Sequence, residues 1–282
     1  MIDAMQITPS LQLLAFLPLL AALVLRLSPG KAPWLRWAPW AALSLGLAHL
    51  LGIADLSGIA ALLAPAALLA LRERMGSKGV RWGLGALVVF WCLVLALHRM
   101  PGIHNPRVLS GTLSPAAAEY QLFWNLDKAF AALYLVEFAV RRQAPTREPR
   151  FLVAAALALG AAMAVAWIGG LTRLEPKWTS ALLWWAPANL LLVALPEETL
   201  FRLILQDRLE AWLGGMAGVA VAAILFGLAH FQGGWCYVAS ATAAGVGYGC
   251  AYRYQRNPWH PILTHFGLNA LHFLAFVYPK LR

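Results

Sequence analysis

The sequence predicts an all-α protein, a polytopic bundle of about eight to ten transmembrane helices. Of its 282 residues, 61% are hydrophobic and only 12% are charged, whereas about 25% of the residues in a soluble domain are charged. The mean hydropathy of +0.67 agrees. Many apolar stretches also approach the roughly 20 helical residues needed to cross about 30 Å of hydrocarbon. The chain is therefore expected to be an integral membrane protein.

Ten apolar stretches follow one another along the chain. They cover 9–27, 37–54, 56–71, 82–97, 121–140, 151–171, 181–209, 217–231, 237–254 and 261–278. Several are short for a span, and Asp55 alone divides the second from the third. Eight to ten helices is therefore the expected number. Gly and Pro gather between the stretches, as in SPGKAP and RNPWHP, and are typical of connecting turns.

The distribution of Lys and Arg predicts the orientation of the helices. If the N-terminus lies outside, most of the 22 basic residues fall in inner loops. These are Arg26, Lys31, Arg36, Arg72, Arg74, Lys78, Arg81, Arg141, Arg142, Arg147, Arg150, Arg208, Arg253 and Arg256. By the positive-inside rule, both termini are then expected outside.

Several classes of protein and site are not favoured. The net charge of +10 is ascribed to loops facing anionic lipid, because nucleic-acid binding needs a clustered basic face. Cys92, Cys236 and Cys250 form neither a disulfide framework nor a paired metal-ligand spacing. The first apolar stretch lacks a basic leader and is followed by further spans, so a cleaved signal peptide is not expected.

Two adjacent acids stand in the seventh stretch, which reads LLVALPEETLFRLILQ. Glu198 and Arg202 are spaced i, i+4 and so share one helical face, where they can pair. Glu197 is turned about 100° away from this face, so its carboxylate is available for another contact or for catalysis. Pro196 removes a backbone hydrogen bond just before the acids and loosens the helix. An alternative is that both acids merely bind Arg202 and lock the helix.

Two later motifs add histidines. His230 ends the eighth stretch in FGLAH, and His265 and Asn269 lie one helical turn apart in HFGLN. His272 follows on much the same stripe. These residues alone could form a hydrogen-bond cluster that holds membrane helices together. Combined with the acids, they supply the base, proton relay and hydrogen-bond donors that water attack on an amide requires.

The order E-E-x-x-x-R, F-x-x-x-H and H-x-x-x-N resembles the CAAX protease and bacteriocin-processing enzyme family, whose members are intramembrane endopeptidases. The matching residues are Glu197, Glu198, Arg202, Phe226, His230, His265 and Asn269. The resemblance begins near Gln121 and takes in Asn125 and Asp127 of the NLDK segment. It implies a catalytic membrane domain over 121–282, preceded by an extension of about four spans over 1–120.

The resemblance also implies a role for each residue. Glu197 would be the general base that activates water, assisted by His230. His265 and Asn269 would stabilise the oxyanion, while Glu198 and Arg202 would orient the site. No cofactor is expected. Zinc is possible with a Glu/His/His set but not favoured, because the chain has no H-E-x-x-H and Asn is a poor zinc ligand.

The expected substrate is a peptide or the membrane-embedded tail of a membrane-anchored protein, cut in a bacterial inner membrane. One rival is an ion- or proton-coupled transporter using Asp127, Lys128 and the acids. Another is a non-catalytic membrane partner or immunity protein. Asp127 and Lys128 are expected to pair internally or support the site. The predicted topology leaves one conflict, since it places His230 at the outer side and His265 near the inner side.

Overall fold

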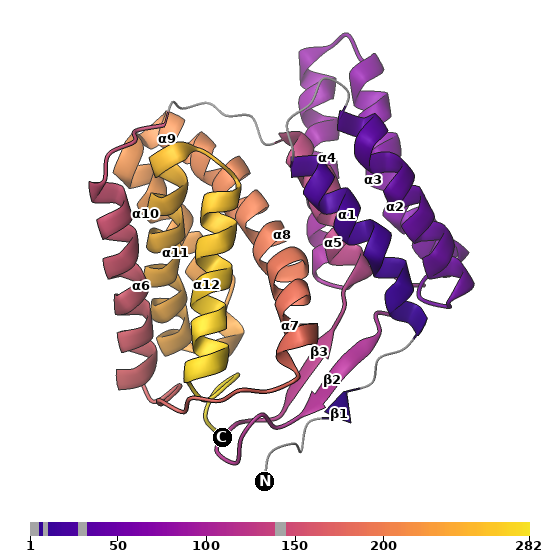
Figure 1. Ribbon diagram of the computed structural model, residues 1–282. Helices are drawn as coiled ribbons and strands as arrows, with labels where there is room; N and C mark the ends of the chain where they lie inside the picture. The colour runs from indigo at the N-terminus through magenta and orange to yellow at the C-terminus, as the bar shows by residue number, and fades with distance from the viewer. Residues whose placement is uncertain (1–5, 8–10, 28–32, 139–144) are drawn as a thin grey trace.

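The computed structural model describes residues 6–7, 11–27, 33–138 and 145–282. Helices dominate these residues, which confirms the all-α bundle (Figure 1). The first lobe contains α1 (Phe16–Leu27), α2 (Pro33–Leu50), α3 (Leu56–Arg74), α4 (Lys78–Ala96) and α5 (Leu126–Leu135). The second contains α6 (Arg150–Ile168), α9 (Asp207–Leu213), α10 (Gly215–Leu228), α11 (Trp235–Gln255) and α12 (Trp259–Ala275). Between them run α7 (Leu182–Ala188) and α8 (Leu195–Glu198).

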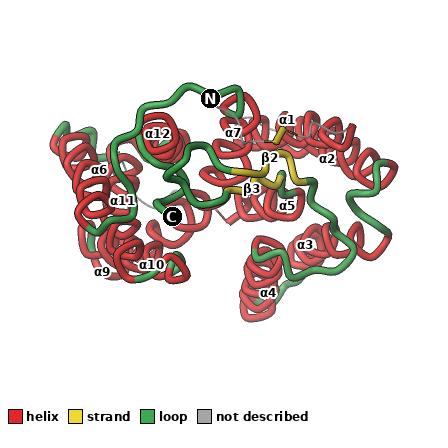
Figure 2. The backbone as a smooth tube through the Cα atoms, turned by 90° about the horizontal axis from the view of Figure 1, so that it is seen from below, coloured by secondary structure: helices red, strands yellow, loops and turns green. Residues whose placement is uncertain are grey.

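Each predicted apolar stretch contains a helix, but the fifth was predicted with the wrong start. Residues Tyr120–Phe123 form strand β3, and α5 begins only at Leu126. Strand β3 pairs antiparallel with β2 (Arg107–Gly111), which pairs with β1 (Gln6–Ile7). Viewed from below, this small sheet lies between α5 and α7, where the two lobes meet (Figure 2). The connection between α4 and α5 is therefore an ordered sheet rather than a simple turn.

Three of the described helices, α3, α4 and α6, are long and apolar enough to cross a membrane. Shorter apolar helical stretches cover Leu11–Leu27 and Gly215–Leu228. Helices α2 and α11 have the length but not the apolar composition, and the seventh stretch is divided into shorter helical pieces. The number of eight to ten spans stays a prediction.

The helices run alternately up and down, so the connections gather at two ends (Figure 1). At one end, Thr146 and Arg147 donate backbone hydrogen bonds to the carbonyls of Arg253 and Tyr254. At the other, the Leu281 N–H donates to the carbonyl of Leu171, and β1 lies at this same end of the molecule (Figure 1). The first is the basic end, which also carries the α3–α4 turn with Arg72, Arg74, Lys78 and Arg81. Lys31, Arg141 and Arg142, which the sequence assigned to this side, lie outside the described residues.

The largest apolar core joins the first lobe to the central helix, our name for residues 182–198, which contain α7 and α8. It contains residues of α1 to α5 together with Trp185, Leu192 and Leu195 of the central helix and Phe273 of α12. Two smaller clusters hold α6, α10 and α11 together. Helix α5 was assigned to the catalytic half by the sequence, yet it packs against α1, α3 and α4 as well as α8. The boundary at residue 120 stays a prediction.

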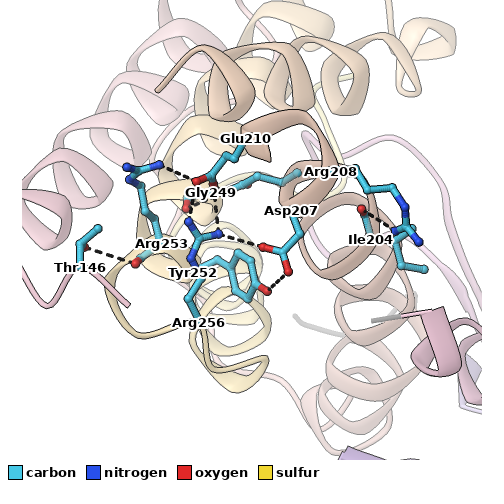
Figure 3. A network of polar contacts seen from close by, with 10 residues as sticks. Thr146, Ile204, Asp207, Arg208, Glu210, Gly249, Tyr252, Arg253 and Arg256 are labelled. Atoms are coloured by element: carbon cyan, nitrogen blue, oxygen red, sulfur yellow. Dashed lines mark hydrogen bonds and ion pairs between the residues drawn. The ribbon is translucent and has the colours of Figure 1, made fainter. Parts of the chain in front are cut away.

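A buried ion network closes the basic end of the second lobe (Figure 3). Arg256 contacts Asp207 at 2.9 Å and also contacts Glu210, and its side chain is only 3% exposed. Arg253 donates to Glu210 as well, and the Tyr252 hydroxyl donates to Asp207 at 3.0 Å. Arg256 ends α11 with a φ of +54°. The network ties α9 to the end of α11, and the sequence analysis missed it because these residues looked like loop charges.

We expect Arg256→Met to lower the free energy of unfolding by about 3–5 kcal/mol, because it removes a buried cation that contacts two buried carboxylates. Methionine suits the left-handed backbone no worse than arginine does. Arg150→Met is the control, since Arg150 pairs with Glu148 on the surface with its side chain 73% exposed, and it should cost under about 1 kcal/mol. Equilibrium unfolding in mixed micelles measures both. Equal losses would contradict a stabilising role for the buried network.

Candidate active site

The two acids lie in a helix whose hydrogen-bond pattern changes twice. The π-helical segment Asn189–Ala194 precedes α8, and a second, Thr199–Gln206, follows it. Pro196 occupies the first turn of α8, where its missing N–H leaves the backbone hydrogen bonding altered. π-Helical turns are rare and often mark functional sites. Glu197 and Glu198 thus end a four-residue α-helix held between two widened turns.

Glu198 is the centre of a fully buried ion cluster. Its side chain is 0% exposed and accepts from Arg202 Nε at 2.9 Å and from His265 Nδ1 at 2.9 Å. The predicted i, i+4 pair with Arg202 is therefore present. Because each carboxylate oxygen receives one donor, Glu198 fixes the rotamer of His265 on α12. The acid joins α8 directly to the last helix.

Arg202 lies between two aromatic rings. Its guanidinium carbon is 5.2 Å from the centre of the Phe226 ring and 5.9 Å from that of Tyr248. Such faces attract cations, and more strongly where water is excluded. Both Nη atoms are buried without a hydrogen-bond partner among the described residues. The ion pair with Glu198 and the two rings thus provide the contacts of this buried charge.

Glu197 faces another partner. Lys128 Nζ of α5 donates to Glu197 Oε1 at 2.8 Å, and the two side chains are 17% and 19% exposed. The alternative that both acids serve Arg202 is therefore wrong. Lys128 supports the site, as expected, but does not pair with Asp127, whose carboxylate contacts His98 at 2.9 Å and Asn105 at 3.1 Å. Glu197 is also close enough to His230 and His265 to interact with them electrostatically.

His230 lies just past the end of α10 and has one nitrogen engaged. Its Nδ1 is 2.8 Å from the carbonyl oxygen of Phe226. Because a carbonyl can only accept, Nδ1 carries a proton, and in the neutral ring Nε2 is then an acceptor. The rings of Phe226 and His230 are 4.7 Å apart, and those of Phe226 and His265 are 5.8 Å apart. The two histidines therefore flank one phenylalanine.

Asn269 is held by a residue that sequence analysis did not single out. Its Nδ2 donates to Oδ1 of Asn189 at 3.2 Å, at the start of the first π-helical segment. Asn189 is buried, and its only sequence signal was an amide in an apolar stretch. His272 instead bonds the carbonyl of Val277 at 3.1 Å and so supports the C-terminal segment.

The histidines and Asn269 line a cavity of about 290 Å³. We call it the histidine cavity. It runs from exposed loop residues Glu119 and Lys280 inward to Tyr248 and His265. Its walls are largely apolar and come from α6, α11 and α12, with Ala162, Ala241, Ala244 and Leu268 among them. Neither Glu197 nor Glu198 is among the lining residues, although Glu198 contacts His265, which is.

The cavity resolves the conflict over depth. His265 is the seventh residue of α12, so it lies about two turns inside the bundle rather than at its edge. His230 stands at the opposite end of α10 from the basic end. Because the cavity reaches from the loops near His230 to the interior near His265, one site can include both.

Sequence reasoning missed the aromatic framework of the site. The Tyr248 ring stacks on His265 with centres 4.5 Å apart and planes 12° apart. Tyr237 meets His230 edge to face at 5.6 Å. Both tyrosines line the histidine cavity, but they lie in a helix of small residues whose sequence shows no polar motif.

The described residues do not fit a metal centre. Among them no group of three or more His, Cys, Asp or Glu side chains is placed to hold a metal ion. Glu198 already binds Arg202 and His265, and Glu197 binds Lys128.

Comparison with known proteins supports the resemblance. Residues 179–271 match the family model described as type II CAAX prenyl endopeptidase Rce1-like. No curated protein and no solved structure matches the chain. The matched segment contains all six predicted site residues: Glu197, Glu198, Arg202, His230, His265 and Asn269. The match covers about a third of the chain and supports the similarity of residues 179–271 to the CAAX protease and bacteriocin-processing enzyme family.

Proposed function

We propose that this protein is an intramembrane endopeptidase that hydrolyses a peptide bond in or near the C-terminal membrane-embedded tail of its substrate. The observation that carries the proposal is the histidine cavity, in which His230, His265 and Asn269 meet beside the paired acids. It is supported by the family match over the same residues.

Glu197 is proposed as the general base. Lys128 engages Oε1, while Oε2 has no hydrogen-bond partner among the described residues and can accept a proton. Lys128 also supplies the counter-charge that a mostly buried carboxylate requires. His230 presents Nε2 as an acceptor and can hold the same water from a second direction. Water then loses a proton to Glu197 as its oxygen bonds to the carbonyl carbon.

His265 and Asn269 are proposed to stabilise the resulting oxyanion. His265 donates through Nδ1 to Glu198 and lines the cavity, where a protonated Nε2 would donate to the oxyanion. The Asn269 amide has two N–H groups, of which one is needed for Asn189. Protonated Glu197 then gives its proton to the leaving nitrogen, the C–N bond breaks, and the new carboxyl group keeps the water oxygen.

The site suggests where the substrate enters. The histidine cavity opens among loop residues of the end opposite the basic one. Under the positive-inside rule this end faces away from the cytoplasm. Apolar walls suit the side chains of a membrane-embedded tail. We therefore propose tails of membrane-anchored proteins whose cleavage sites lie on the extracytoplasmic side of a bacterial inner membrane.

Glu197→Gln and His230→Ala should each reduce cleavage about 100-fold or more, because general acid–base catalysis contributes roughly 10²–10⁴ in rate. C-terminal trimming of membrane-anchored proteins in cells can be followed by peptide mapping. Specific tails, with sites on the extracytoplasmic side, should persist uncut in both variants at unchanged protein levels. Glu148→Gln, in an outlying surface ion pair, is the matched control.

Wild-type trimming in both variants would overturn the protease assignment. The motifs would then be structural, and a transporter or a non-catalytic membrane partner would become the better reading. If the tails that persist uncut have cytoplasmic cleavage sites, the protease assignment would stand. Only the proposed side of substrate entry would then be wrong.

Metal independence gives a second prediction. Because the acids are engaged by Lys128, Arg202 and His265, chelator titration of the purified active protein should leave cleavage unchanged. A complete loss that added zinc restores would refute the metal-free mechanism.

A further inference from the structure

A second and larger cavity lies between the two lobes, away from the histidines. We call it the α4 cavity. Its volume is about 630 Å³. One wall is a face of α4. The opposite wall includes Phe138, after α5, Ile204 of the second π-helical segment and Arg208 of α9. It shares no lining residue with the histidine cavity.

One end of the α4 cavity is strongly basic. Four cations line it, namely Arg72, Lys78, Arg81 and Arg208, against a single acid, Glu137. That acid is already paired with Arg26 at 2.7 Å. Glu73, outside the lining, contacts Arg72 at 2.7 Å and Arg81 at 3.7 Å. Lys78 has no ion pair within the described part of the chain, and Nε of Arg72 is buried without a hydrogen-bond partner there. The lining therefore keeps a positive excess.

The remainder of the cavity is apolar and long. Its α4 residues after Arg81 recur every three or four positions and so form one face: Trp82, Gly85, Ala86, Val89, Phe90 and Leu93. From Lys78 to Leu93 this face extends about 22 Å at about 1.5 Å per residue. Helix α4 is also one of the helices able to cross a membrane. The cavity thus begins at loop level and continues to bilayer depth.

We propose that the α4 cavity binds an anionic phospholipid, with the phosphate among Arg72, Lys78 and Arg81 and an acyl chain along α4. The basic end belongs to the side assigned to the cytoplasm, whose leaflet carries anionic lipid. A free phosphate would fill only the basic end, and the same cations would repel the quaternary ammonium that a zwitterionic lipid such as phosphatidylcholine carries beside its phosphate. Only a molecule with both parts matches the whole lining.

The test uses the full-length protein in nanodiscs of phosphatidylcholine with a minor share of phosphatidylglycerol, followed by native mass spectrometry of retained lipid. Wild type should retain phosphatidylglycerol over phosphatidylcholine. The double variant Lys78→Gln/Arg81→Gln should weaken this retention about 30-fold, because each cation near the headgroup contributes roughly a fivefold factor. Arg74→Gln, a basic residue at the same end but outside the lining, should retain it.

A second pair of variants tests the acyl chain. Ala86→Trp fills the apolar part and should abolish retention of any lipid, whereas Leu87→Trp, on an exposed position outside the lining, should not. Inorganic phosphate added in excess should fail to displace the lipid. The proposal would be overturned if wild type retained the two lipids equally. It would also be overturned if Arg74→Gln lost phosphatidylglycerol as much as the double variant does, or if phosphate alone displaced the lipid.

Discussion

The architecture of the site depends on one buried carboxylate. Glu198 has no exposed surface, and it receives a guanidinium from its own helix and an imidazole from α12. Removing one partner from a buried ion pair costs about 3–5 kcal/mol, because the other charge is left uncompensated. The same contacts direct His265 toward the cavity with Tyr248 stacked on its ring. Stability and the orientation of the site therefore rest on the same atoms.

The irregular helix around this carboxylate separates its two acids. In a uniform α-helix neighbouring side chains diverge by about 100°, and here α8 presents Glu198 to Arg202 and Glu197 to Lys128. The first of the flanking π-helical segments begins with Asn189, and the second contains Arg202. One segment of chain thus supplies the contact to Asn269, the proposed base and the ion cluster that holds His265. This concentration is what makes the four-residue helix the centre of the site.

The first lobe contributes more to the site than an appended domain would. Lys128 of α5 reaches Glu197, and α5 is itself packed among α1, α3 and α4. The α4 cavity then connects this lobe to Ile204, in the segment directly after the acids. A change in packing at the lobe interface can therefore move the helical segment that contains Glu197 and Glu198 through direct contacts.

The sequence sufficed for features with a local or compositional cause. Apolar stretches predicted the helices, and i, i+4 spacing predicted the contact between Glu198 and Arg202. What it could not give depends on distant segments: Lys128 beside Glu197, Asn189 beside Asn269, and the β2–β3 pair inside an expected turn. The ion network of Asp207, Glu210 and Arg256 was missed for the same reason, since charges at helix ends resemble loop charges until the ends are brought together.

The most direct test of the account is cleavage of an identified substrate tail by purified protein in water enriched in oxygen-18. The mechanism makes water the nucleophile, so the new C-terminal carboxyl group should carry one heavy oxygen, and Glu197→Gln should yield almost no product. Finished product incubated in the same water controls for exchange. A product made without heavy oxygen would contradict the account, because its acyl group would have passed to another nucleophile.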